Sequence, residues 1–167
     1  MHSSAAFRPL RNVFPTFGHL LVVPPGSMVR VAKRRYPFTP RTTRQLERGD
    51  IIGVRCEPDG WVCLQVVDLK HSGAGSLTTF VAGALLWSST ESPPTAAAVT
   101  GLAAIQQGLT RIELFSEGQA QVFCNVPVRD IGLDSNFRDF EVGTRHRVWG
   151  WRVAIGKAQA AAAGRLG

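Results

Sequence analysis

Hydrophobic and polar positions alternate with the period of a β-strand in two runs that flank a short polar turn. The runs are "DIIGVRC" (residues 50–56) and "WVCLQVVDL" (residues 61–69), and "EPDG" lies between them. β-Branched and aromatic residues suit strands, whereas Pro and Gly suit turns. The pattern therefore predicts an antiparallel hairpin. We expect its turn to bring Cys56 near Trp61, and Val54 near Cys63 on the same face.

Four later runs predict the rest of a sheet. They are "TTFVAGALLW" (78–87), "LTRIELF" (109–115), "QAQVFCNVPV" (119–128) and "HRVWGWRVAIG" (146–156). The first is continuously apolar, which is typical of a central strand covered on both faces. In the last run, alternation places Trp149 and Trp151 on the same side of a strand that closes the core.

One segment, "SPPTAAAVTGLAAIQQG" (92–108), predicts the main helix. Ser92 is a suitable N-cap, the Ala-rich sequence has high helix propensity, and Gly108 suits a left-handed end. Ala98, Leu102 and Ile105 would form its apolar stripe. The fold class expected from these elements is α+β: a mostly antiparallel, twisted sheet or partial barrel with one main helix.

The chain of 167 residues is long enough for one domain with a hydrophobic core. Residues 1–46 contain six prolines and no sustained period, which predicts a basic, flexible N-terminal arm. Residues 47–158 carry the predicted α+β domain. The Ala-rich stretch 159–167 is expected to be a tail, or part of a frayed helix.

Positive charge is concentrated in the expected arm. The formal net charge is +7, yet residues 1–46 hold eight basic and no acidic residues, and the remainder holds eleven basic and twelve acidic residues. The expected domain is therefore close to neutral, which argues against a nucleic-acid partner. The arm is either a solvated tail or a segment that docks on an acidic partner or on phosphates.

Cysteine use and hydropathy indicate a cytoplasmic protein. Three cysteines without CxxC spacing fit a reducing compartment, and no run approaches the roughly 18 apolar residues of a membrane span. The alternative is secretion, because Arg8 and Arg11 precede the short apolar run "HLLVV" in the manner of a signal peptide. Met28 is an alternative start to the chain.

No standard catalytic motif is present, and the four histidines have no pair at metal-ligand spacing, so we expect neither a metal nor a cofactor. Reactive groups are most concentrated at Asp50, Cys63, Asp68 and His71. A thiolate or carboxylate could act as nucleophile, and His71 could accept a proton from water. Each also has a structural explanation. Asp50 would bond the backbone where a strand begins, and Cys63 would pack in the core. Asp68 would be a charge at the end of a strand, and His71 a single histidine in a loop.

Aromatic residues offer a second candidate site. Four tryptophans either pack in the core or line an apolar pocket that accepts an aromatic group: Trp61, Trp87, Trp149 and Trp151. Beside the last two, Arg147 either faces solvent or polarises an oxygen of a bound ester.

Several segments, taken in order, resemble one bacterial family. They are the lead "RRYPFTPRTTRQLERGD", the hairpin "GDIIGV…DGWVCLQVV", "FVAGALLW", "PPTAAAVTGLAAIQQGLTRIE" and "VWGW", which together span about residues 33–152. In this order they resemble the immunity-protein and phosphotriesterase HocA family. The resemblance implies hydrolysis of organophosphate triesters such as coroxon and paraoxon.

The leading expectation is therefore a small cytoplasmic phosphotriesterase whose substrates have an aryl leaving group. His71 or Asp68 would be the base for water, Cys63 the alternative nucleophile, and Trp61 and Trp149 the walls of an aromatic slot. The alternative is an immunity-type binding protein that neutralises a toxin without catalysis.

Overall fold

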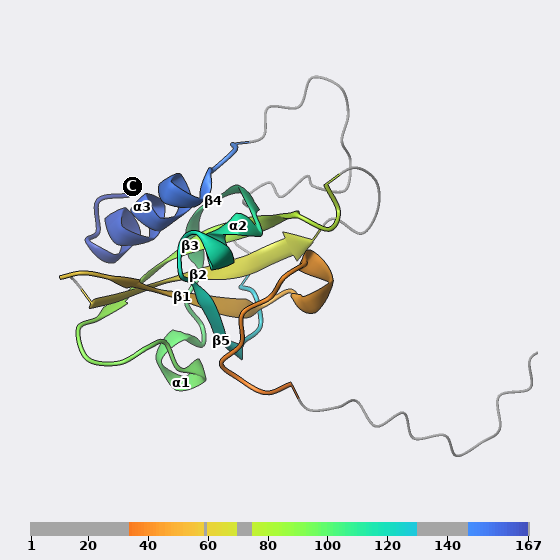
Figure 1. The fold of residues 1–167 in the computed structure, drawn as a ribbon. Coiled ribbons are helices and arrows are strands. Elements are labelled where there is room, and N and C mark those ends of the chain that lie inside the picture. The colour runs from red at the N-terminus through yellow and green to blue at the C-terminus, as the bar shows by residue number, and fades with distance from the viewer. Residues whose placement is uncertain (1–33, 59, 70–74, 130–146, 167) are drawn as a thin grey trace, which may run out of the picture. The chain divides into compact units, whose positions relative to one another are not determined.

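The computed structural model describes residues 34–58, 60–69, 75–129 and 147–166 (Figure 1). Its elements are η1 (Thr43–Gln45), β1 (Asp50–Cys56), β2 (Gly60–Leu69), β3 (Thr79–Ser89), α1 (Ala96–Val99), β4 (Ala104–Arg111), α2 (Glu113–Ser116), β5 (Gln121–Asn125) and α3 (Trp151–Ala162). In the part of the chain that the structure describes, α3 is the longest helix.

The strands form one open, antiparallel sheet in the order β4-β3-β2-β1-β5. The α+β class, the antiparallel sheet and the single main helix are confirmed. The prediction of β3 as a central strand is also confirmed, because it lies between β2 and β4 and buries both faces. Phe80 and Ala82 belong to one core cluster, while Val81 and Leu85 belong to the other.

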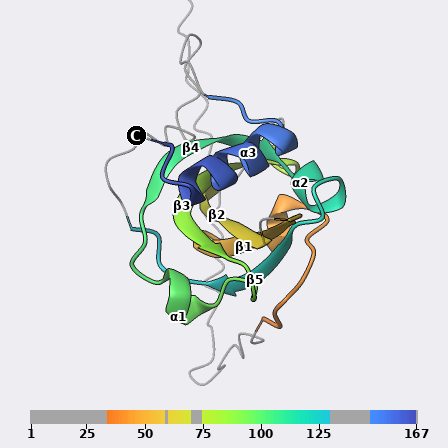
Figure 2. The ribbon, with the colours of Figure 1, turned by 90° about the vertical axis from the view of Figure 1, so that its left-hand side faces the viewer.

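The two faces of the sheet carry separate cores. One face packs against α3 and α2 (Figure 2). Ile52 and Leu64 of this face share a core cluster with Leu114 of α2. The opposite face includes Ile51 and is covered in part by Val99 of α1. Burying each Ile or Leu contributes about 1.5–3 kcal/mol, so side chains on both sides of the sheet stabilise it.

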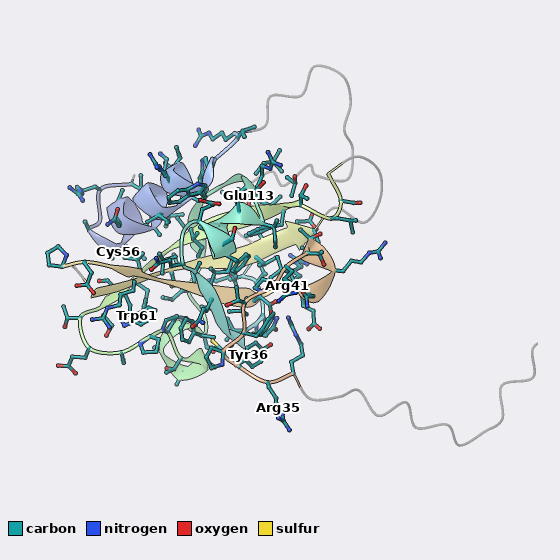
Figure 3. The ribbon with its side chains drawn as sticks, viewed as in Figure 1. Arg35, Tyr36, Arg41, Cys56, Trp61 and Glu113 are labelled. Atoms are coloured by element: carbon teal, nitrogen blue, oxygen red, sulfur yellow. The ribbon has the colours of Figure 1, made fainter. Side chains whose placement is uncertain are left out.

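The hairpin forms, but its predicted register is wrong. Cys56 pairs with Gly60, and Trp61 pairs with Arg55 instead. A shift of one residue exchanges the faces of a strand. Cys56 therefore lies in the core beneath α3, whereas Trp61 lies on the opposite side of the ribbon, together with Cys63 (Figure 3).

The long helix predicted over 92–108 is wrong. Thr95, and not Ser92, is the N-cap, and its side chain accepts a hydrogen bond from the amide of Ala98 at 3.3 Å. The helix ends after one turn, because Gly101 adopts a left-handed φ of 82°. Residues 104–111 then pair with β3 as strand β4, which satisfies their backbone groups along the sheet edge.

The strand predicted over 109–115 is wrong in part, and the strand predicted over 146–156 does not form. In the first, β4 ends at Arg111 and α2 begins at Glu113. In the second, Val148 forms only an isolated bridge with Leu109, and Trp151 begins α3. This helix continues through the expected C-terminal tail as far as Ala162.

The spacing of buried alanines explains why α3 is a helix. Ala154, Ala158 and Ala161 are fully buried and recur at intervals of four and three residues, so they lie on one face. Their small side chains allow the helix to approach the sheet closely, and it contacts β3 more than any other element.

Part of the expected N-terminal arm belongs to the folded unit, which begins at Arg34. Phe38 exchanges two backbone hydrogen bonds with Val122 of β5, at 3.0 and 2.9 Å. Thr43 and Leu46 are buried. The boundary at residue 46, which rested on charge, therefore falls inside the fold. Arg35, Arg41 and Arg44 are exposed, but Arg34 pairs with the buried Asp50 and the neighbouring Thr43 and Leu46 are buried. The remainder of the expected arm, residues 1–33, lies outside the described residues.

Candidate functional site

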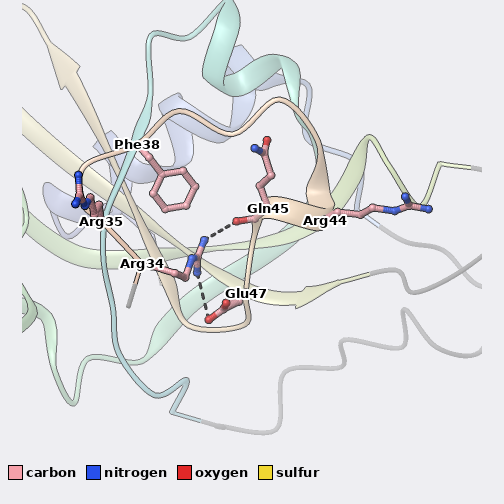
Figure 4. A pocket seen from close by; sticks show the side chains of 6 residues that line it. All are labelled: Arg34, Arg35, Phe38, Arg44, Gln45 and Glu47. Carbon is pink, nitrogen blue, oxygen red and sulfur yellow. Dashed lines mark hydrogen bonds and ion pairs between the residues drawn. The ribbon is translucent and has the colours of Figure 1, made fainter. Parts of the chain in front are cut away.

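A surface recess of about 340 Å³ lies where the 34–42 segment and η1 meet the start of β1 (Figure 4). It is lined by Arg34, Arg35, Phe38, Arg44, Gln45 and Glu47. We call these six residues the basic recess. Five of them come from residues that the sequence assigns to a flexible arm, so sequence reasoning did not identify the site.

The basic recess is built on a buried ion pair. The guanidinium of Arg34 donates to both carboxylate oxygens of Asp50, at 2.8 and 3.0 Å. Asp50 has no exposed surface, and it also accepts hydrogen bonds from the Glu47 amide at 2.9 Å and the Asn125 side chain at 2.9 Å. A buried carboxylate satisfied in this way is rigid and fully engaged.

Arg34 makes further contacts that fix its side chain. Nη1 lies 3.3 Å from a carboxylate oxygen of Glu47, and the guanidinium lies over the Phe38 ring, 4.7 Å from its centroid. Burial alone would lower the pKa of Arg34, but the hydrogen bond and negative charge of Asp50 outweigh it, so the pKa is raised. Arg34 therefore stays charged and is already paired.

The 3-10 helix η1 positions Arg44. The backbone amide of Thr42, the N-cap, donates to the side-chain oxygen of Gln45 at 3.3 Å in a capping box, and the amide of Arg41 donates to the same oxygen at 2.6 Å. Thr43 is anchored by its amide, which donates to the carbonyl of Leu77 at 3.0 Å. Arg44 is consequently held on a short, fixed turn with its side chain exposed.

Two guanidinium groups at the basic recess are free to bind. Arg35 and Arg44 are both exposed, and neither forms an ion pair or side-chain hydrogen bond with any residue that the structure describes. Figure 4 shows them on either side of Arg34 and Phe38. A guanidinium is a planar, permanently charged donor, so this arrangement suits carboxylate or phosphate groups.

The predicted catalytic residues that the structure describes have separate surroundings. Asp50 is the buried partner of Arg34 beneath the basic recess. Asp68 is half-buried at the end of β2, and one of its oxygens accepts a hydrogen bond from the amide of Leu69 at 2.9 Å. His71 lies outside the described residues.

Cys63 is a core residue in this fold. It has no exposed surface and belongs to the cluster opposite α3. Burial raises the pKa of the Cys63 thiol, and the proximity of Cys124 raises it further. A protonated thiol without solvent access lacks the properties of a nucleophile.

The expected aromatic slot does not form between Trp61 and Trp149, because they lie on opposite faces of the sheet. Trp61 is half-buried and packs edge-on against Phe123, with ring centroids 5.4 Å apart. Trp149 is buried in the α3-side core. Its indole covers Gly108 so closely that a Cβ added to this glycine would lie 2.6 Å from the ring.

The remaining predicted binding residues lie at the start of α3. Trp151 is half-buried and packs against the α3-side core, and Arg152 lies over its ring at 5.0 Å from the centroid. Arg147 is exposed, and its carbonyl accepts a hydrogen bond from the amide of Leu109 at 2.8 Å. Neither Trp151 nor Arg147 lines the basic recess.

A sequence signal for the basic recess does exist. Thr42 and Gln45 have the spacing of a capping box, and the aromatic residues Tyr36 and Phe38 stand two positions apart, as on one face of a strand. The six prolines of the first 46 residues obscured both signals.

Among the described ranges, no three His, Cys, Asp or Glu side chains gather to form a metal-binding group. No helix within those ranges is long and apolar enough to cross a membrane. Comparison with protein-family models, with curated proteins and with solved structures gives no match for this chain.

Proposed function

We propose that this chain is a cytoplasmic binding protein of the immunity type, which neutralises a toxin protein by binding it and not by catalysis. One observation carries this proposal: the basic recess presents Arg35 and Arg44 without an acidic partner in the described part of the chain, on a rigid base. It offers charged donors for recognition, but it contains no thiol, hydroxyl or imidazole to act as nucleophile or base. The resemblance to the immunity-type family supports the same function.

The test is protection and complex formation with a toxin-type protein encoded beside this chain. The two proteins are co-expressed, growth is compared with that of cells expressing the toxin alone, and the dissociation constant is measured by calorimetry. We expect restored growth and a stable complex. Absence of a complex, with a toxin shown to be active, contradicts the proposal.

Hydrolysis of organophosphate triesters with an aryl leaving group is the second candidate function. Asp68 favours it, because only one of its carboxylate oxygens has a hydrogen-bond partner in the described structure. His71 follows three residues later in the sequence. In this reaction, Asp68 or His71 takes a proton from water, the water oxygen forms a bond to phosphorus, and the phosphorus–oxygen bond to the aryl group breaks. The aryloxide leaves with the electron pair.

Paraoxon hydrolysis tests the second candidate. The rate is measured for the unaltered protein, for Asp68→Asn and His71→Ala, and for Glu91→Gln as a control that removes an exposed carboxylate elsewhere. A base contributes about 10²–10⁴-fold, so a rate loss of that size in one of the first two variants supports catalysis. Absence of turnover in the unaltered protein, with and without a chelator, excludes this function.

A further inference from the structure

We infer that the basic recess is the contact surface for an acidic segment of the partner protein, whose Asp or Glu side chains bind Arg35 and Arg44. This inference rests on the proposed binding function, and it names the chemistry of the partner.

The first support is the imbalance of charge around the basic recess. Residues 34–48 contain five arginines and one acidic residue, Glu47, and the carboxylates of Glu47 and Asp50 are both directed to Arg34. Exposed Arg55 and Arg111, by contrast, each pair with a glutamate two residues away, at 2.8 and 3.0 Å. Arg35 and Arg44 therefore lack a counter-charge in the described residues. Exposed arginines near α3 lack one as well, but they do not line this recess.

The second support is preorganisation. The ion pair of Arg34 with Asp50 holds the base of the recess, and the capping box holds η1. Arg35 and Arg44 are thus attached to backbone that is already ordered, so binding costs mainly the freedom of their side chains. Because both arginines extend from ordered backbone, they favour partners whose carboxylates lie within reach of both side chains.

The third support distinguishes an acidic protein segment from nucleic acid. The Phe38 ring is already contacted by the guanidinium of Arg34, at 4.7 Å from the ring centroid, so that face is not available for stacking a base. Glu47 lies at the same recess, and the phosphate groups of a nucleic-acid backbone offer no hydrogen-bond donor to its carboxylate. Glu47 can also accept hydrogen bonds from the amides of a peptide.

The experiment measures binding of three fluorescein-labelled probes by anisotropy: a Glu/Gly peptide, the matched Gln/Gly peptide and a single-stranded oligonucleotide of the same charge as the Glu/Gly peptide. The full chain is compared with the double variant Arg35→Gln/Arg44→Gln. Arg152→Gln/Arg165→Gln is the control, because it removes the same charge from two exposed arginines at α3 and beyond it. Thermal unfolding verifies that all three proteins are folded.

We expect the Glu/Gly peptide to bind the full chain more tightly than the other two probes. The recess variant should weaken this binding by about tenfold or more, because each charge-assisted hydrogen bond contributes about that much. The control variant should change it by less than about threefold, the effect of net charge at physiological ionic strength. Equal weakening in both variants, preferential binding of the oligonucleotide, or absence of Glu/Gly binding overturns the inference.

The same two variants separate this inference from the proposed function. If the recess variant still binds the neighbouring toxin as tightly as the full chain does, the recess is not the contact surface, while the binding function stands. If the full chain binds no toxin, the proposed function fails, whatever the peptide result.

Discussion

Arg34 and Asp50, which are sixteen residues apart in the sequence, form a bidentate ion pair. Nη1 of Arg34 lies 2.8 Å from Oδ1 of Asp50, and Nη2 lies 3.0 Å from Oδ2. The pair joins the 34–42 segment to the first residue of β1. Because Asp50 has no exposed surface, its carboxylate depends on protein donors for its hydrogen bonds, and Arg34 supplies two of them. The basic recess therefore depends on the same contact that attaches this segment to the sheet.

Replacing Arg34 with Ala should destabilise the fold. Loss of one member of a buried ion pair costs about 3–5 kcal/mol, and we expect the lower end because the Arg34 side chain retains 22% of its exposure. Urea denaturation measures the change. Arg35→Ala is the control, with an expected change within about 0.5 kcal/mol. Equal unfolding free energies for the two variants would show that Asp50 is satisfied without Arg34.

Replacing Gly108 with Ala should also destabilise the fold, but through packing. The added Cβ would meet the indole of Trp149 at 2.6 Å, closer than van der Waals contact, so the indole or β4 has to move. Such overpacking costs about 1–3 kcal/mol. The shift in thermal midpoint, together with the near-ultraviolet circular dichroism of the tryptophans, reports it. An unchanged dichroism spectrum and midpoint would contradict the close contact.

Replacing Gly156 with Ala should stabilise the fold. Gly156 lies inside α3, and nothing beyond the neighbouring helix backbone approaches its Cβ position within 4 Å. Ala is favoured over Gly within a helix by about 0.5–1 kcal/mol. Gly150→Ala is the matched control, since Gly150 has equally open space but is the N-cap of α3, where Ala offers no gain. A loss of stability in Gly156→Ala, measured by urea denaturation, would contradict the helix.

The buried thiols should make the folded state less stable at alkaline pH. Burial raises the pKa of both Cys63 and Cys124 in the folded state. Above the ordinary thiol pKa of about 8.5, the unfolded chain therefore binds fewer protons than the folded chain does. The free energy of unfolding then falls as pH rises, by up to about 1.4 kcal/mol per pH unit for each thiol.

The measurement is a urea denaturation series above about pH 8.5 for the unaltered protein and for Cys63→Ala. The variant should lose some stability at neutral pH, yet its stability should decline less steeply with pH. Identical slopes in the two proteins would mean that the Cys63 thiol titrates normally in the folded state, in contradiction to its burial.

Local patterning in the sequence was sufficient to predict the strands of the sheet centre. Alternating runs bounded by Gly and Pro predicted β1 and β2, and a continuous apolar run predicted β3 as a strand covered on both faces. These features depend on side-chain period and hydrophobicity, which are properties of short segments. The α+β class followed from them.

Sequence patterns gave the wrong secondary structure where a segment is compatible with both a helix and a strand. Residues 104–108 have good helix formers, but pairing with β3 satisfies their backbone and makes them part of β4. Conversely, the two tryptophans suggested a strand at 146–156, although Ala154, Ala158 and Ala161 already showed the helical spacing of α3. The helix propensity of a residue is a weak preference, and tertiary contacts outweigh it.

The sequence by itself determined that the chain has strands with two apolar faces, three dispersed cysteines and a basic N-terminal region. Only the tertiary structure decided that Arg34 pairs with Asp50, that Trp61 and Trp149 lie on opposite faces, and that Arg35 and Arg44 border one recess. The physical reason is that these relationships depend on strand register and on packing between distant segments, and a shift of one residue changes which side chains meet.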